Sequence, residues 1–204
     1  MPAKLPGSGN GSALYYGLKS LQQEYLLRQL LAGMDLRWKK INQSELTCTL
    51  ASLVAQDTAA IPDELAASME EPESSILLLD QLSDEQINTL LTKIRQTKGL
   101  HIDLKAVVTK HNRNWTFLEL AAELKREQVY MRRFMALRAL VGKGEEILAT
   151  DKTDDILQGL LEQAKQLLAA AQSGEEIDQD RFMSTGRELS ERLQQLEQAE
   201  DTIT

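Results

Sequence analysis

Polar side chains able to bind a ligand or exchange protons stand at the ends of two predicted strands. Asp80 comes directly after the apolar run 76–79, and residues 109–115 lie at the end of the run 104–109. Ligands of open parallel sheets bind beyond the carboxyl ends of the strands, where these side chains would meet. The candidate site comprises Asp80, Thr109, Lys110, His111, Asn112, Asn114 and Trp115. Lys19 and Asn42, which follow the two earlier strands, are expected nearby.

The same loop also has a purely structural interpretation. Thr116 and Glu119 have the spacing of a capping box at the start of a helix. Asn112 and Asn114 suit a turn, because their side chains bond to nearby backbone and tolerate left-handed geometry. On this interpretation the segment only ends a strand and begins a helix, and the sequence leaves both interpretations open.

Other catalytic chemistry finds little support in the sequence. His101, His111 and Cys48 do not have the spacing of metal ligands, so no metal or cofactor is expected. Cys48 is interpreted as a small buried helix residue. Asp80 follows a strand as the phosphorylated Asp of a receiver domain does. Receivers also need an acidic pair after their first strand, where this chain has residues 17–19 (GLK).

Apolar periodicity predicts the elements that would position the site. The strands are expected at residues 13–18, 36–41, 76–79 and 104–109. The helices are expected from Ser20 to Gly33, from 44 to 55, from Ser83 onward and from Thr116 onward. A surface loop covers residues 56–74, with one helical turn near 63–69. This order predicts an α/β fold with a small four-stranded, mostly parallel sheet made of two strand–helix–strand–helix halves.

The two halves share a spacing of apolar residues. Leu14, Leu18, Leu26, Leu27 and Leu30 precede Leu78, Leu82, Leu90, Leu91 and Ile94 by 64 residues. With a slightly larger offset, residues 35–37 (DLR) correspond to 103–105 (DLK). The pattern indicates an internal duplication, although any two strand–helix–strand–helix units could share it.

The chain changes character after Val141. Gly142 and Gly144 are expected to form a turn, and Thr153 is expected to cap a helix that ends at residues 173–174. A last helix is expected over 178–200, so that residues 142–204 form an acidic helical extension able to complete a three-helix bundle. This part carries 6 basic and 15 acidic residues, whereas residues 1–141 are nearly neutral. Three parts are therefore predicted: a disordered tail over 1–12, an α/β domain over 13–141 and the extension.

Residues 103–124 (DLKAVVTKHNRNWTFLELAAEL) are the most distinctive stretch of the chain. The sequence resembles a bacterial family known as domain of unknown function 3783. The resemblance rests on the strand 104–107, on Thr109, on residues 112–116 (NRNWT) and on the earlier runs 76–79 and 82–85. It is clear over about residues 75–128 and vague over 13–55. It implies a family fold but no activity.

Composition limits the class of protein. The single cysteine, Cys48, allows no disulfide within the chain, and no run approaches the roughly 20 apolar residues of a membrane span. The N-terminal residues lack the apolar core of a signal peptide. We therefore expect a cytoplasmic protein with no membrane contact.

Three functional hypotheses follow. The first is a non-catalytic protein-interaction or small-ligand-binding module, with a protein partner or a second copy bound through the C-terminal helices. The second is an enzyme using Asp80, Lys110 and His111, which would need a cavity holding a titratable group of shifted pKa. The third, a nucleic-acid binder using the basic helix 125–138, is the least favoured, because such charges more often form a solvated face. Its binding would weaken steeply with salt.

Overall fold

The computed structural model describes residues 11–59, 61–62, 66, 70–150, 154–175 and 177–201. The chain divides into two compact units, Met1–Arg126 and Glu127–Thr204. The division falls inside one long helix, α5 (Phe117–Ala149), which passes through the predicted domain boundary at 141/142. Residues 1–10 of the predicted tail lie outside the described part of the chain. Ser12, the last residue of the predicted tail 1–12, instead begins the first strand and is buried, so the predicted tail is wrong at this residue.

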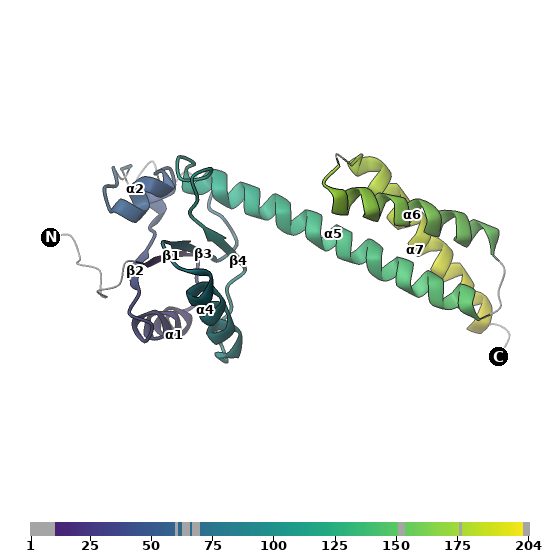
Figure 1. Cartoon of the computed structure of the whole chain (residues 1–204), viewed down its shortest axis with the longest axis horizontal. Coiled ribbons are helices and arrows are strands. Elements are labelled where there is room, and N and C mark those ends of the chain that lie inside the picture. Colours follow the sequence, from purple (N-terminus) through teal and green to yellow (C-terminus); the bar gives the residue numbers. More distant parts are fainter. Residues whose placement is uncertain are drawn as a thin grey trace. The chain divides into compact units, whose positions relative to one another are not determined.

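A four-stranded sheet forms the centre of the first unit (Figure 1). Its strands are β1 (Ser12–Tyr16), β2 (Arg37–Lys40), β3 (Ile76–Asp80) and β4 (Leu104–Val107). They lie side by side in the order β2-β1-β3-β4. β1 pairs with β2 in parallel and β3 pairs with β4 in parallel, whereas the central strands β1 and β3 are antiparallel. The predicted α/β class and the mostly parallel sheet are confirmed.

The antiparallel central pair corrects one expectation about the site. β1 and β2 run in the direction opposite to β3 and β4. The carboxyl ends of β1 and β2 therefore lie at one end of the sheet, and those of β3 and β4 lie at the other end. The positive charge of Lys19 lowers the pKa of Asp103, so the two side chains are near each other. Asp103 accepts a hydrogen bond from Ser75, just before the start of β3, whereas Asp80 ends that strand. Lys19 therefore lies at the end of the sheet away from Asp80. The prediction that Lys19 and Asn42 join the candidate site is wrong. The amino ends of β1 and β2 lie beside Asp80 instead.

Helices cover both faces of the sheet. α1 (Leu21–Ala32) and α4 (Asp84–Gln96) lie together on one face, as Figure 1 shows. The 3-10 turn η1 (Gln43–Glu45), α2 (Leu50–Ala55) and the start of α5 cover the other face. Each helix begins where local sequence supplies a cap: Ser20 for α1, Thr49 for α2 and Ser83 for α4. Residues 63–65 and 67–69 of the predicted helical turn lie outside the described chain.

The two halves are related by a pseudo-two-fold axis. It passes through the pair Leu14 and Leu78, because β1 and β3 pair antiparallel about that point. The axis also relates α2 to the start of α5, whose caps Thr49 and Thr116 form an antiparallel bridge. The Leu50 N–H donates to the Trp115 carbonyl at 2.9 Å, and the Phe117 N–H donates to the Cys48 carbonyl at 3.1 Å. These two bonds are images of each other, which supports the predicted duplication.

The symmetry also corrects one predicted equivalence. Leu27 and Leu90, which are fully buried, each occupy the seventh position of their helices. The predicted match of Leu26 with Leu90 is therefore displaced by one residue.

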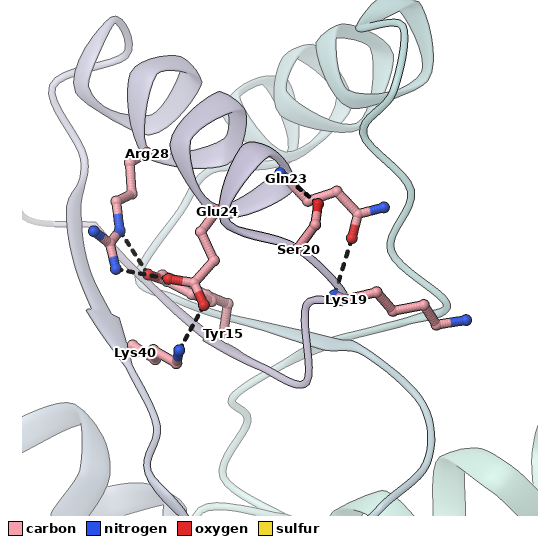
Figure 2. A network of polar contacts seen from close by, with 7 residues as sticks. All are labelled: Tyr15, Lys19, Ser20, Gln23, Glu24, Arg28 and Lys40. Atoms are coloured by element: carbon pink, nitrogen blue, oxygen red, sulfur yellow. Dashed lines mark hydrogen bonds and ion pairs between the residues drawn. The ribbon is translucent and has the colours of Figure 1, made fainter.

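One buried carboxylate on the α1 side of the sheet has its charge fully compensated. Figure 2 shows Glu24 of α1 between Arg28 and Lys40, which donate to its two oxygens at 2.9 and 2.5 Å. Arg28 also donates from Nε to the Tyr15 hydroxyl at 2.7 Å and lies over the Trp38 ring. This network attaches α1 to the edge strand β2 and gives each member a structural role.

The second unit is a three-helix bundle. It consists of the later part of α5 with α6 (Asp155–Ser173) and α7 (Gln179–Asp201), which share one apolar core. The turn predicted at Gly142 and Gly144 is wrong, because both residues lie within α5. The described cap of α6 is Asp154, whose carboxylate accepts from the Leu157 N–H at 2.8 Å and pairs with Arg192 at 2.6 Å. Thr153, the predicted cap, lies outside the described residues.

Candidate functional site

Three polar side chains form a row across adjacent strands at one end of the sheet. Ser12 of β1 lies opposite Arg37 of β2 and opposite Asp80 of β3. Residues paired in this way point to the same face of a sheet, here the face covered by α2 and the start of α5. Ser12 and Asp80 are buried, with 2% and 8% of their surface exposed.

An open cavity of about 610 Å³ lies beside this row. Its wall on one side is α2, which contributes Ala51, Val54 and Ala55. The polar side is built by Arg37, Asp80, Gln81, Thr109, Lys110 and Arg113. Arg37 is half-buried, while Lys110 and Arg113 are exposed. Among the described lining residues, three side chains are cationic and one, Asp80, is a carboxylate.

The loop after β4 is held in place by the side chain of Asn112. Its Oδ1 accepts from the Thr109 N–H at 2.7 Å, and its amide nitrogen donates to the Val107 carbonyl at 3.0 Å. The Arg113 carbonyl then accepts from the Ala51 N–H of α2 at 2.8 Å. The loop that carries Lys110 and Arg113 is thus fixed to both the strand and the opposite wall of the cavity.

Asp80 is an unusual carboxylate in this setting. Its Oδ2 is buried and accepts no hydrogen bond from any residue of the described chain, and the same holds for the Ser12 hydroxyl. Burial raises the pKa of Asp80, while the positive charges of Arg113 and Arg37 oppose that rise. A buried acceptor without a donor costs free energy, so its presence calls for a reason.

A related cavity lies at the other end of the sheet. There the equivalent row consists of Tyr16, Ile76 and Leu104, which pair across β1, β3 and β4. The cavity measures about 370 Å³, and Leu118 and Ala121 of α5 form its wall where Ala51 and Val54 stand in the first cavity. The Tyr16 hydroxyl donates to Glu71 Oε2 from the segment beside it.

The structure brings some of the predicted site residues together and separates others. Asp80, Thr109 and Lys110 line the cavity, whereas His111, Asn114 and Trp115 are exposed and do not line it. Asn112 acts on the loop backbone, and Thr116 and Glu119 form the predicted capping box, with bonds of 2.7 and 3.2 Å. Arg37 and Arg113 were not predicted as site residues. Arg113 stands within the distinctive loop, but nothing in the sequence pairs Arg37 with Asp80.

The basic residues 125–138 do not form one uniform cluster. Lys125 pairs with Glu73 and Arg126 pairs with Glu123 in the first unit. Arg132, Arg133 and Arg138 in the second unit are exposed.

Two other kinds of feature are absent from the described residues. Among the described residues, no group of three His, Cys, Asp or Glu side chains is arranged to hold a metal ion. None of the helices in the described ranges combines the length and apolarity of a membrane span.

Comparison with known proteins found a family similar to part of this chain. No curated protein and no solved structure was found to match the chain. One family model matches residues 75–131, which include β3, α4, β4, the loop with Lys110 and Arg113, and the first turns of α5. The match confirms the resemblance noted over about 75–128. The matching family is described as domain of unknown function (DUF3783), and residues 75–131 are similar to it.

Proposed function

We propose that the first unit is a non-catalytic module that binds a small anionic molecule in the cavity lined by Arg37, Asp80, Lys110 and Arg113. The observation that carries the proposal is the difference between the two related cavities. The same scaffold positions hold Tyr16, Ile76 and Leu104 at one end of the sheet, and Asp80, Ser12 and Arg37 at the other. The fold therefore does not need charged residues at these positions.

The charge of the cavity favours an anion. Lys110 and Arg113 bring two exposed positive charges to the wall of the cavity, where Asp80 is the carboxylate among the described lining residues. Guanidinium groups match the geometry of phosphate and carboxylate oxygens, and both arginines here approach from different strands or loops. The rigid attachment of the loop through Asn112 supports binding, because a preformed site loses less entropy when the ligand enters.

An enzyme is the second candidate. Asp80 is a titratable group of raised pKa within a cavity, which is a feature of catalytic acids and bases. Of its two predicted partners for acid–base chemistry, Lys110 lines the cavity but His111 does not. A binding module therefore explains more of the residues that line the cavity than an enzyme does.

Isothermal titration calorimetry with inorganic phosphate tests the proposal on the full chain. We expect saturable binding that Arg113→Gln weakens about tenfold or more, equivalent to about 1.4 kcal/mol. Arg95→Gln is the matched control, because Arg95 is an exposed arginine on α4 outside the cavity. Equal binding by both variants, or no saturable binding by the wild type, would refute the proposal.

A further inference from the structure

One edge of the sheet offers backbone groups that the described chain does not use. β4 is the outermost strand on its side and pairs with β3 alone. The Val108 N–H donates to the Leu79 carbonyl of β3 at 2.8 Å. Because successive residues of a strand direct their backbone groups to opposite sides, the N–H and C=O of Lys105 and the N–H of Val107 face outward. Among the described residues, none bonds to these three groups.

The side chains at this edge do not close it. A strand edge is often protected by a charge that extends from it. The Lys105 ammonium instead donates to the Ile102 carbonyl at 2.5 Å, so this side chain stays beside its own strand. The Asn112 amide donates to the Val107 carbonyl at 3.0 Å, which covers only the end of β4. The first half of β4 therefore keeps an edge to which an extended chain can pair.

The smaller cavity, of about 370 Å³, lies at the start of this strand. Leu104 of β4 and Ile76 of β3 line it from the sheet, and Leu118 and Ala121 line it from α5. Neighbouring residues on adjacent strands point to the same face of a sheet. A residue paired beside Leu104 would therefore direct its side chain to the face that carries this cavity. An apolar side chain suits such a lining.

The rim of the smaller cavity favours a basic occupant. Glu70 and Glu73 are exposed carboxylates of the segment that lines it, whereas Glu71 is engaged by the Tyr16 hydroxyl. Lys125 is the cation among the described lining residues, and its ammonium lies 3.8 Å from Glu73. Both members of that pair are exposed, so the pair is weak and open to exchange. Charge complementarity therefore favours a partner that carries Lys or Arg.

We propose that the edge of β4 binds an extended basic segment of a partner protein as an added strand. An apolar side chain of the segment enters the smaller cavity, and flanking Lys or Arg side chains contact Glu70 and Glu73. Backbone hydrogen bonds to Lys105 and Val107 hold the segment, while the cavity and the carboxylates select its sequence. The site lies at the end of β3 and β4 away from Asp80, so it is independent of the anion cavity.

Capped hexapeptides test the proposal on the full chain. The probe is Lys-Val-Leu-Val-Lys-Thr with a fluorescent label. One counterpart has Glu in place of both Lys residues, and another is N-methylated at the three central residues, which blocks strand pairing. In fluorescence anisotropy the wild type should bind the probe about tenfold more tightly than either counterpart. The probe should also slow amide hydrogen exchange at Lys105 and Val107.

Two pairs of variants locate the bound peptide. Ala122→Trp fills the cavity from an exposed position of α5 and should weaken probe binding about tenfold. Ala139→Trp, at an exposed position of the same helix in the second unit, should bind as the wild type does. The double variant Glu70→Gln with Glu73→Gln should lose the preference for the probe over its acidic counterpart. Glu85→Gln, on the exposed surface of α4, should keep that preference.

Several results would overturn the proposal. Equal probe binding by Ala122→Trp and Ala139→Trp would place the peptide outside the smaller cavity. Equal affinity for the N-methylated peptide would exclude strand pairing. A wild-type dimer that Ala122→Trp dissociates would make a second copy of the chain the occupant of this edge. Absence of probe binding would also overturn the proposal, and it would leave the anion cavity unaffected.

Discussion

Tyr16 and Asp80 occupy equivalent positions at opposite ends of the two central strands, since Tyr16 pairs with Ile76 as Asp80 pairs with Ser12. One position is satisfied by the chain itself, through Glu71, and the other is not satisfied within the described residues. The pseudo-two-fold arrangement thus has the same backbone frame at both ends, with different chemistry. The difference makes the Asp80 end the functional candidate.

Asp80→Asn should stabilise the protein at neutral pH by about 1 kcal/mol, because it removes the ionised form of a buried carboxylate that lacks a donor. Burial raises the folded-state pKa of Asp80 above the ordinary value of 3.8. The penalty is therefore present above the folded-state pKa and disappears as the pH falls through it towards the ordinary value. Thermal unfolding of the wild type and of Asp80→Asn from pH 7 to pH 4 measures the difference in their stability, which should become smaller on acidification. A less stable variant at pH 7 would show that Asp80 has a structural role.

Asn112→Ala should lower the free energy of unfolding by about 1–2 kcal/mol, because two hydrogen bonds to the loop backbone are lost. Asn114→Ala, on an exposed neighbour in the same loop, is the control and should stay within about 0.5 kcal/mol of the wild type. Urea unfolding of the two variants measures the difference. Similar losses in both would mean that the Asn112 bonds do not hold the loop.

Tyr16 should remain protonated at a pH where an ordinary tyrosine, with a pKa of 10.0, has ionised. Burial and the hydrogen bond to Glu71 both raise its pKa, and the negative charge of Glu71 adds to the effect. Because the folded-state pKa exceeds the unfolded one, Tyr16 should make the protein less stable as the pH rises above about 10. The difference between wild type and Tyr16→Phe in ultraviolet titration isolates this hydroxyl.

Glu71→Gln provides the control for that titration. It keeps a side chain that can accept from Tyr16 but removes the charge, so the Tyr16 pKa should fall relative to the wild type. An unchanged tyrosine titration in Glu71→Gln would contradict the contact between the two side chains.

Gly142→Ala and Gly144→Ala should have opposite effects on the three-helix unit. Both glycines lie inside α5. A methyl group at Gly142 meets nothing within 4 Å. Alanine there should therefore raise the free energy of unfolding by up to about 1 kcal/mol through its higher helix propensity. At Gly144 the methyl group would lie 2.8 Å from Leu161 Cδ2, a buried side chain, and overpacking of this kind costs about 1–3 kcal/mol. Two thermal unfolding curves decide the matter, and equal shifts would refute the packing of α6 on α5.

Local spacing in the sequence was enough to predict the caps and the strands. Ser83 with Gln86 and Thr116 with Glu119 form the expected capping boxes, because such contacts need only residues three apart. The apolar run of β3 was found for a similar reason. The continuation of α5 through Gly142 and Gly144 was missed, because the core of the bundle overrides the weak helix preference of glycine.

The composition of the site depended on strand pairing, which the sequence does not determine. The runs of β1 and β3 have the same apolar pattern whichever direction they pair, so the antiparallel arrangement could not be read from them. Arg37 lies in a segment interpreted only as a strand. Its place beside Asp80 follows from the register of Ser12 with both residues. The loop residues Thr109 and Lys110 could be predicted because they follow β4 directly.

Nuclear magnetic resonance mapping of phosphate binding tests the central claim most directly. A ¹⁵N-labelled full chain is titrated with inorganic phosphate at constant ionic strength, with chloride as the reference anion. The account predicts saturable shifts of the backbone amides near Arg37, Asp80, Thr109, Lys110 and Arg113, with little change near Tyr16 and Glu71. Shifts spread evenly over exposed lysines and arginines, or an unaffected Asp80 region, would contradict a binding site in this cavity.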